Sequence, residues 1–123
     1  MAKATIIVLS DPKGGDEALG RMFNALAAVH DLKRRDRPVE LVFQGAGTRW
    51  ISVLEKSDHP AHVLYEAVKD TISGASAGCA TLFGAISDVE SARVPLLSDN
   101  PVPGTAGLPS VARFVADGPV LTF

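Results

Sequence analysis

The chain begins with a short, unbroken apolar run, Ala-Thr-Ile-Ile-Val-Leu-Ser at residues 4–10, which stops at the turn-forming residues 11–16. A run of this length bounded by turn residues is typical of a strand buried on both faces of a parallel sheet. Similar but weaker runs follow at residues 39–44, 71–77, 94–97 and 120–123. Parallel strands need long connections, which are usually helices. The pattern therefore predicts an α/β fold with five strands.

The segments between these runs repeat apolar residues at helical spacing, so each should bury one face. The residues predicted to face inward are Leu19, Met22, Phe23, Leu26 and Val29 in the first helix, Trp50, Ile51 and Leu54 in the second, Val63, Leu64, Ala67 and Val68 in the third, and Val111, Phe114 and Val115 in the last. This alternation of strands and helices predicts a parallel sheet with helices on both faces.

Several residues are expected to start these helices. Asp16 and Thr48 are suitable N-caps, and Pro60 suits a first helical position. The helix that begins near residue 79 should break at residues 84–87, where Asp88 can cap a second helix. The sequence thus predicts a series of short helices after one long one.

Composition restricts the class of protein. The 123 residues are 46% hydrophobic and 21% charged, which suits a single domain spanning 1–123. The net charge of −2 offers no surface for nucleic acid, and the basic cluster at residues 33–37 is expected to be a solvated helix end. The apolar stretch at residues 5–9 is too short for a signal peptide, and no run reaches membrane-spanning length. We therefore expect a cytoplasmic protein that binds neither nucleic acid nor membrane.

The glycine-rich and histidine motifs do not indicate a nucleotide-binding, hydrolase or metal site. The glycines at 14–15 and 45–47 do not match a nucleotide-binding pattern and are typical of tight turns. Residues 74–78 match G-x-S-x-G, but the chain is too short for an α/β-hydrolase and no histidine follows His62. His59 and His62 lack a third ligand, so Asp58-His59 is expected to form a capping turn. We expect neither a metal ion nor an organic cofactor.

Cys79 is the only cysteine, and it follows a run of small residues where a strand should pass into a helix. Unpaired backbone N–H groups and the helix dipole at such a junction favour the thiolate, which is the nucleophilic form. A lone cysteine in an alanine-rich stretch can equally be a small buried apolar residue. Because one cysteine cannot form an intrachain disulfide, the sequence is compatible with a reducing compartment.

Ligand sites in open α/β sheets form beyond the carboxyl ends of the strands. Three loops of this chain should leave those ends, at residues 10–16, 45–48 and 78–79. If the first three strands are neighbours, these loops converge around Cys79. The other candidate ligand-binding residues are Asp11, Lys13, Thr48, Ser76 and Gly78.

The segment Gly-Ala-Ser-Ala-Gly-Cys-Ala at 74–80, with Phe-Gly-Ala at 83–85, resembles the DsrE/DsrF-like family of small sulfur-metabolism proteins. The opening strand with Ser-Asp-Pro at 10–12, the helix after His59-Pro60 and the carboxyl-terminal pattern extend this resemblance over nearly the whole chain. The resemblance implies a three-layer α/β/α sandwich with a five-stranded parallel sheet. It also implies homo-oligomers or assemblies of related subunits, and sulfur relay through a cysteine persulfide.

Related single-domain members often carry C-x-x-C at this segment, whereas this chain has Ser76 in the first position. A single thiolate is still sufficient to accept and release sulfur, and Ser76 could donate a hydrogen bond to the Cys79 sulfur. Three functions therefore stay open. They are a persulfide carrier with a protein sulfur donor or acceptor, a non-catalytic interaction or scaffold protein, and a small-ligand-binding module that uses Asp11, Lys13, Thr48 and Ser76.

Overall fold

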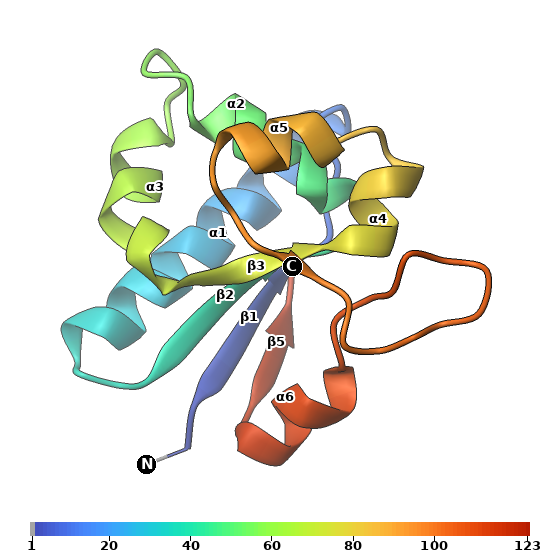
Figure 1. Ribbon diagram of the computed structural model, residues 1–123. Coiled ribbons are helices and arrows are strands. Elements are labelled where there is room, and N and C mark those ends of the chain that lie inside the picture. Colours follow the sequence, from blue (N-terminus) through green and yellow to red (C-terminus); the bar gives the residue numbers. More distant parts are fainter. Residues whose placement is uncertain (1) are drawn as a thin grey trace.

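The computed structural model describes residues 2–123. Five strands form one sheet in the order β4-β3-β2-β1-β5, and every pairing is parallel. They are β1 (Ala4–Val8), β2 (Val39–Phe43), β3 (Ile72–Ser76), β4 (Leu96–Leu97) and β5 (Val120–Thr122). The strands of Figure 1 all run toward the same edge, where their carboxyl ends meet. The predicted five-stranded parallel sheet is confirmed.

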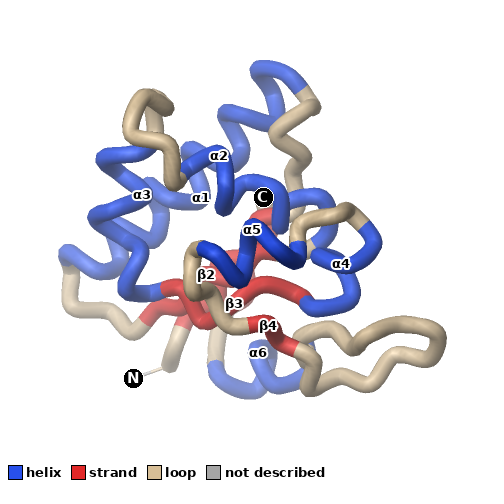
Figure 2. The backbone as a smooth tube through the Cα atoms, turned by 45° about the horizontal axis from the view of Figure 1, so that its top comes forward, coloured by secondary structure: helices blue, strands red, loops and turns tan. Residues whose placement is uncertain are grey.

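Helices cover the sheet unequally. The helices are α1 (Gly15–Arg34), α2 (Trp50–Leu54), α3 (His62–Val68), α4 (Ala77–Leu82), α5 (Ile86–Ser91) and α6 (Val111–Asp117), with 3-10 helices η1 (Gly45–Arg49) and η2 (Lys69–Thr71). Figure 2 shows α1, α2, α3 and α5 on one side of the sheet, α6 on the other, and α4 at the carboxyl edge. The architecture is an α/β/α sandwich with one thick and one thin outer layer.

The two cores follow from the alternation of side chains along each strand. Ile6, Val8, Leu41 and Phe43 face the thick layer and are buried against helices α1 to α5. Ile7 and Val42 face the other way and pack against Phe114 of α6. The thin layer therefore depends on one aromatic side chain.

Helix α1 begins earlier than the sequence predicted. Its N-cap is Gly14, whereas Asp16 lies exposed in the first turn. The reason is a turn at Asp11, whose carbonyl oxygen accepts the Gly14 N–H at 2.8 Å and whose carboxylate accepts the Lys13 N–H at 3.0 Å. Asp16 still stabilises the helix, because its negative charge in the first turn interacts favourably with the positive end of the helix dipole.

Two other predicted helix starts are wrong. The Thr48 hydroxyl donates to the Gly45 carbonyl oxygen at 2.9 Å inside η1, so α2 begins only at Trp50. Pro60 lies in a turn, because α3 begins at His62. Both connections hold a tight turn before the helix, which moves the N-cap of α2 by one residue, to Arg49, and the start of α3 by two residues, to His62.

The predicted break after Cys79 is confirmed, but its cap is not. Helix α4 ends at Leu82, and Gly84 has a φ of +70°, a left-handed conformation that glycine adopts without strain. The following helix α5 has Ala85 at its N-cap position, and Asp88 lies inside its first turn. The left-handed glycine redirects the chain, so α5 starts without a side-chain cap.

Some residues predicted to face inward are exposed. Phe23 is 47% exposed on α1, and Val63 is 81% exposed on α3, where Ala67 is exposed as well. Helix α3 buries Val68, as predicted, but its other buried residue is Tyr65, whose large ring sets which face turns inward, and Ala61 just before the helix is buried as well. On α6, Val111 and Val115 are 47% and 62% exposed, since Phe114 alone meets the sheet.

Candidate functional site

Cys79 lies at the junction that the sequence predicted. Strand β3 ends at Ser76, helix α4 follows directly, and Cys79 occupies its first turn with a half-buried side chain. The buried Ser76 hydroxyl oxygen accepts the Cys79 backbone N–H at 3.2 Å, so Ser76 is the N-cap of α4. The Ser76 oxygen therefore holds the backbone of Cys79, a role different from the expected hydrogen bond to its sulfur.

A second backbone group at this turn is also engaged. The Gly78 N–H donates to the Gly107 carbonyl oxygen at 2.7 Å, which attaches the loop of residues 98–107 to α4. A Cβ atom at Gly78 would lie 2.8 Å from the Leu108 Cδ1 atom and 3.1 Å from the Gly107 carbonyl oxygen, so a larger residue would force the Leu108 side chain to shift. The backbone N–H of Gly78, a candidate ligand-binding residue, is therefore used to hold the loop.

A hollow of about 350 Å³ lies between α4 and this loop. It is lined by Gly78, Thr81, Leu82, Gly104, Thr105 and Ala106. These lining residues carry no charge, and the Leu82 side chain is 78% exposed. The surface beside Cys79 on α4 is therefore uncharged and partly apolar.

Arg49 connects the loops at the carboxyl edge, a role that no sequence pattern predicted. Its Nη1 atom lies 3.1 Å from the Asp11 carboxylate, its Nε donates to the Phe83 carbonyl oxygen at 3.1 Å, and its guanidinium lies over the Phe83 ring. Any side chain at Gly47 would overlap the Val8 carbonyl oxygen, so η1 packs directly on the end of β1. Arg49 thereby ties the loops after β1 and β2 to the end of α4.

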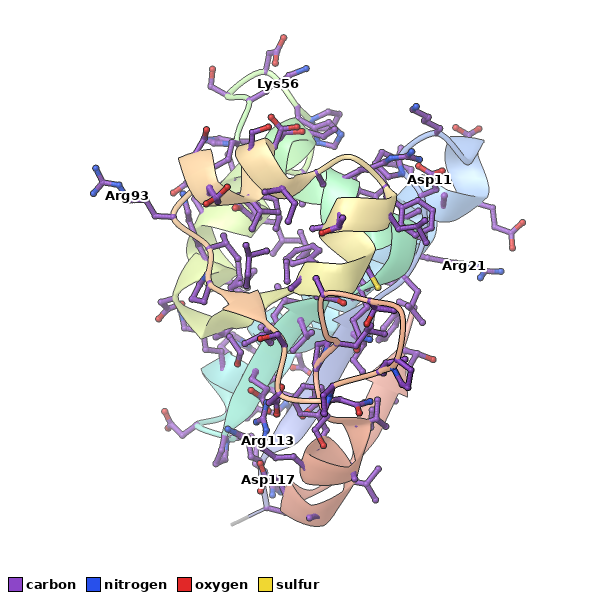
Figure 3. The ribbon with its side chains drawn as sticks, turned by 45° about the vertical axis from the view of Figure 1, so that its right-hand side comes forward. Asp11, Arg21, Lys56, Arg93, Arg113 and Asp117 are labelled. Carbon is purple, nitrogen blue, oxygen red and sulfur yellow. The ribbon has the colours of Figure 1, made fainter. Side chains whose placement is uncertain are left out.

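The predicted ligand-binding residues do not share one surface. Thr48 and Ser76 are closed to solvent, Lys13 is exposed, and Asp11 is paired with Arg49. Figure 3 shows Asp11 far from Arg113 and Asp117, which lie toward the other end of the molecule. The loops converge at the carboxyl edge as expected, but their side chains mainly hold one another.

The histidines also bind backbone groups. His59 Nδ1 accepts the Ala61 N–H at 3.0 Å, which is the expected capping turn, and His62 Nδ1 lies 2.7 Å from the Leu54 carbonyl oxygen. No group of three or more metal-ligating side chains occurs among residues 2–123. Within the same residues, no helix has the length and apolar character needed to cross a membrane.

A separate titratable cluster joins α2 to α3. Lys69 Nζ lies 2.7 Å from Glu55 Oε2 and also lies over the ring of the buried Tyr65. Burial and the adjacent Glu55 carboxylate raise the pKa of Tyr65. Burial alone would raise the pKa of Glu55, but the effects of Lys69, Tyr65 and His62 together outweigh it and lower this pKa below its usual value. The cluster fixes α3 on α2.

Neither a family model nor a curated protein matches this chain. Among solved structures, it is similar to a conserved protein of unknown function from Bacteroides thetaiotaomicron, with a TM-score of 0.64 and 15% sequence identity. The match covers 99% of this chain and 95% of that one. At this identity the likeness concerns the fold, and it shows that the same sandwich occurs in a protein of nearly the same extent.

Proposed function

We propose that this protein is a small sulfur carrier of the DsrE/DsrF-like type, in which Cys79 accepts sulfur as a persulfide and passes it on. The observation that carries the proposal is the position of Cys79. The only thiol of the chain is half-buried in the first turn of α4, just beyond the carboxyl end of a parallel strand. Ligands of open α/β sheets bind at this edge.

The transfer needs no oxidant and no cofactor. The Cys79 thiolate attacks the outer sulfur of a donor persulfide R–S–SH, a new S–S bond forms at Cys79, and the donor leaves as the thiolate R–S⁻. The product is Cys79–S–SH, and an acceptor thiolate then takes its outer sulfur by the same exchange. One S–S bond forms and one breaks in each step, so the number of electrons is unchanged.

The absence of a second cysteine from the sequence favours a relay function. A C-x-x-C protein can expel its carried sulfur by closing an internal disulfide, whereas this chain has Ser76 in that position. The sulfur on Cys79 therefore has to leave to a thiol of another molecule. A carrier that depends on a free thiol also suits a reducing compartment, and we place it in the cytoplasm.

We further propose that the donor or acceptor is a protein, either a related subunit or a separate sulfur-relay component. Leu82 supports this, because it lies one turn after Cys79 and is 78% exposed beside an uncharged hollow. An exposed leucine next to a reactive group suits contact with an apolar protein surface. Light scattering with and without the Leu82→Ser substitution tests whether the surface joins copies of this chain, because a mass that falls to the monomer identifies a homo-oligomer.

The carrier function is tested by the reactivity of Cys79 in the folded protein. The rate of alkylation is measured against pH, and the mass of the protein is measured after incubation with a persulfide donor. We expect a rate profile centred below the usual thiol pKa of about 8.5 and a gain of one sulfur that is absent from Cys79→Ser. A matched control is Ser87→Ala, an exposed position on α5.

A thiol that reacts only after denaturation contradicts the carrier function. The interaction or scaffold function then becomes the better proposal, and exposed Val111 and Val115 on α6 support it. In that case Cys79→Ser leaves the assembly of the protein unchanged.

A further inference from the structure

Gln44 is a buried polar residue at the carboxyl end of β2. Gln44 is only 8% exposed, and no hydrogen-bond donor within residues 2–123 reaches its Oε1 atom. Its backbone N–H donates to Val8 and its backbone carbonyl accepts from Gly47, so the main chain is fully engaged. A buried amide oxygen without a donor destabilises a fold. Such an oxygen therefore requires an explanation other than packing.

The register of the sheet places Gln44 beside the turn that carries Cys79. Phe43 pairs with Ala75, and Gln44 keeps an extended backbone directly after β2, so continuing this register by one residue sets Gln44 opposite Ser76. Paired residues of parallel strands direct their side chains to the same face. Gln44 and Ser76 are therefore adjacent buried polar groups at the carboxyl edge.

Ser76 connects this pair to Cys79. Its hydroxyl oxygen accepts the Cys79 N–H, which makes Cys79 the third residue of the helix after the cap. Side chains of a helix lean toward its amino end. The Cys79 side chain therefore leans toward the amino end of α4, which Ser76 caps and near which Gln44 follows β2.

We propose that the side-chain amide of Gln44 is a positioning residue for the sulfur that Cys79 carries. This inference rests on the proposed carrier function. Addition of one sulfur lengthens the Cys79 side chain by about 2 Å. The terminal S–H of Cys79–S–SH then donates to Gln44 Oε1, and the proton stays on sulfur.

The burial of Oε1 favours a ligand of this kind. The oxygen is closed to solvent, so a free molecule would have to displace part of the protein to reach it. A sulfur atom that is covalently bound to a neighbouring side chain needs no path from solvent, only a local shift of side chains. Gln44 therefore stabilises the loaded carrier relative to the empty one and slows loss of sulfur to water-borne thiols.

The experiment compares the loading equilibrium of three proteins, namely the wild type, Gln44→Met and the control Asn24→Leu. Methionine keeps the length of glutamine without an acceptor oxygen, and Asn24 is an exposed amide on α1. Each protein is equilibrated with glutathione persulfide and glutathione, and the persulfide fraction on Cys79 is measured by intact mass. We expect the equilibrium constant for loading to fall about fivefold in Gln44→Met, the effect of one lost hydrogen bond, and to stay unchanged in the control.

A thermal melt of the unloaded proteins separates a role in sulfur binding from a role in the fold. Because Oε1 has no donor, we expect Gln44→Met to melt at a temperature about 5 °C higher than the wild type. A lower melting temperature would show that the amide supports the fold, and an unchanged loading constant would show that it does not contact the sulfur. Either result overturns the inference. If the wild-type protein takes up no sulfur, the carrier function itself is refuted, and this outcome is distinct from the two that overturn the role of Gln44.

Discussion

The two faces of the sheet differ in how much protein covers them and in what they bury. On the thick face, side chains from β1 and β2 contact five helices and are apolar throughout. On the thin face, covered by α6, the two strands bury Thr5 and Glu40 among only a few apolar residues, and Gln44 is buried directly after β2. One sheet thus carries an apolar core on one face and a partly polar core on the other. The partly polar core extends to the carboxyl edge, where Cys79 lies.

The polar residues of the thin face are themselves of two kinds. Glu40 is fully partnered, because its carboxylate accepts hydrogen bonds from Thr5 and Ser73 and lies 3.6 Å from Lys3 Nζ. Gln44, four residues further along the chain, has an oxygen without a donor. At the amino end of this face, hydrogen bonds to Glu40 join β2 to its two neighbouring strands, whereas we propose that Gln44 at the carboxyl end binds sulfur.

The substitution expected to lower the free energy of unfolding most lies on the thick face. Leu26 of α1 is fully buried in its core. Leu26→Ala should lower the free energy of unfolding by about 3 kcal/mol, the sum of lost apolar burial and the cavity left behind. Urea denaturation followed by circular dichroism measures this loss. A loss near zero would mean that the thick face tolerates a cavity and does not dominate stability.

The next effect concerns the partnered carboxylate. Glu40→Ala removes the acceptor of the Thr5 and Ser73 hydroxyls and should lower the free energy of unfolding by about 2 kcal/mol. The matched double variant Glu40→Ala with Thr5→Val, which also removes one unpartnered hydroxyl, should recover part of this loss. If the single variant is as stable as the wild type, the polar network joins no strands and the contrast with Gln44 disappears.

A smaller and more local effect is expected for Phe114→Ala. Phe114 is the residue of α6 that packs on Ile7 and Val42, so its loss should release α6 while the thick core persists. We expect a decrease of about 1–2 kcal/mol, less than for a general core aromatic because only one small layer detaches. Hydrogen exchange should then lose protection in residues 111–117 alone. Loss of protection across β1 and β2 would show that the two faces unfold together.

The smallest effect is a pH dependence within the thick layer. The pKa of Glu55 is lowered in the folded protein, so its contribution to stability is complete above the unfolded value near 4.5 and is lost as pH falls through the lower folded value. Glu55 is 32% exposed and its partner Lys69 34% exposed, so solvent screening limits the effect to about 0.5 kcal/mol. Glu55→Gln should therefore flatten the stability curve slightly below pH 4.5. An unchanged curve in acid-melting experiments would contradict this.

Sequence patterns were most successful where a segment was long or wholly apolar. The run at residues 4–10 predicted a buried parallel strand because β-branched and apolar residues follow one another up to the turn at residue 11, and β1, including Thr5, is buried throughout. The seven-residue helices α3 and α6 failed this test, since two turns leave several apolar faces of similar size. Contacts with Tyr65 and Phe114 selected the buried faces, and those contacts join residues distant in sequence.

The features of the candidate site also fall into those that local residue types predict and those that depend on contacts between distant residues. The position of Cys79 after a strand and at the start of a helix followed from local residue types, because small residues and a serine cap favour such a junction. The roles of Arg49 and Gln44 did not, since Arg49 pairs with Asp11 across 38 residues and Gln44 lies beside Ser76 only through strand register. A lone arginine and a lone glutamine carry no periodic signal.

The sequence alone determined a five-stranded parallel sheet and a single thiol at its carboxyl edge, because hydrophobic runs and turn residues act over a few neighbouring positions. Only the tertiary structure decided which face of each short helix is buried, that the loops are joined through Arg49, and that Gln44 lies beside the Cys79 turn. These features depend on pairings between distant segments, whose free energies no local pattern records.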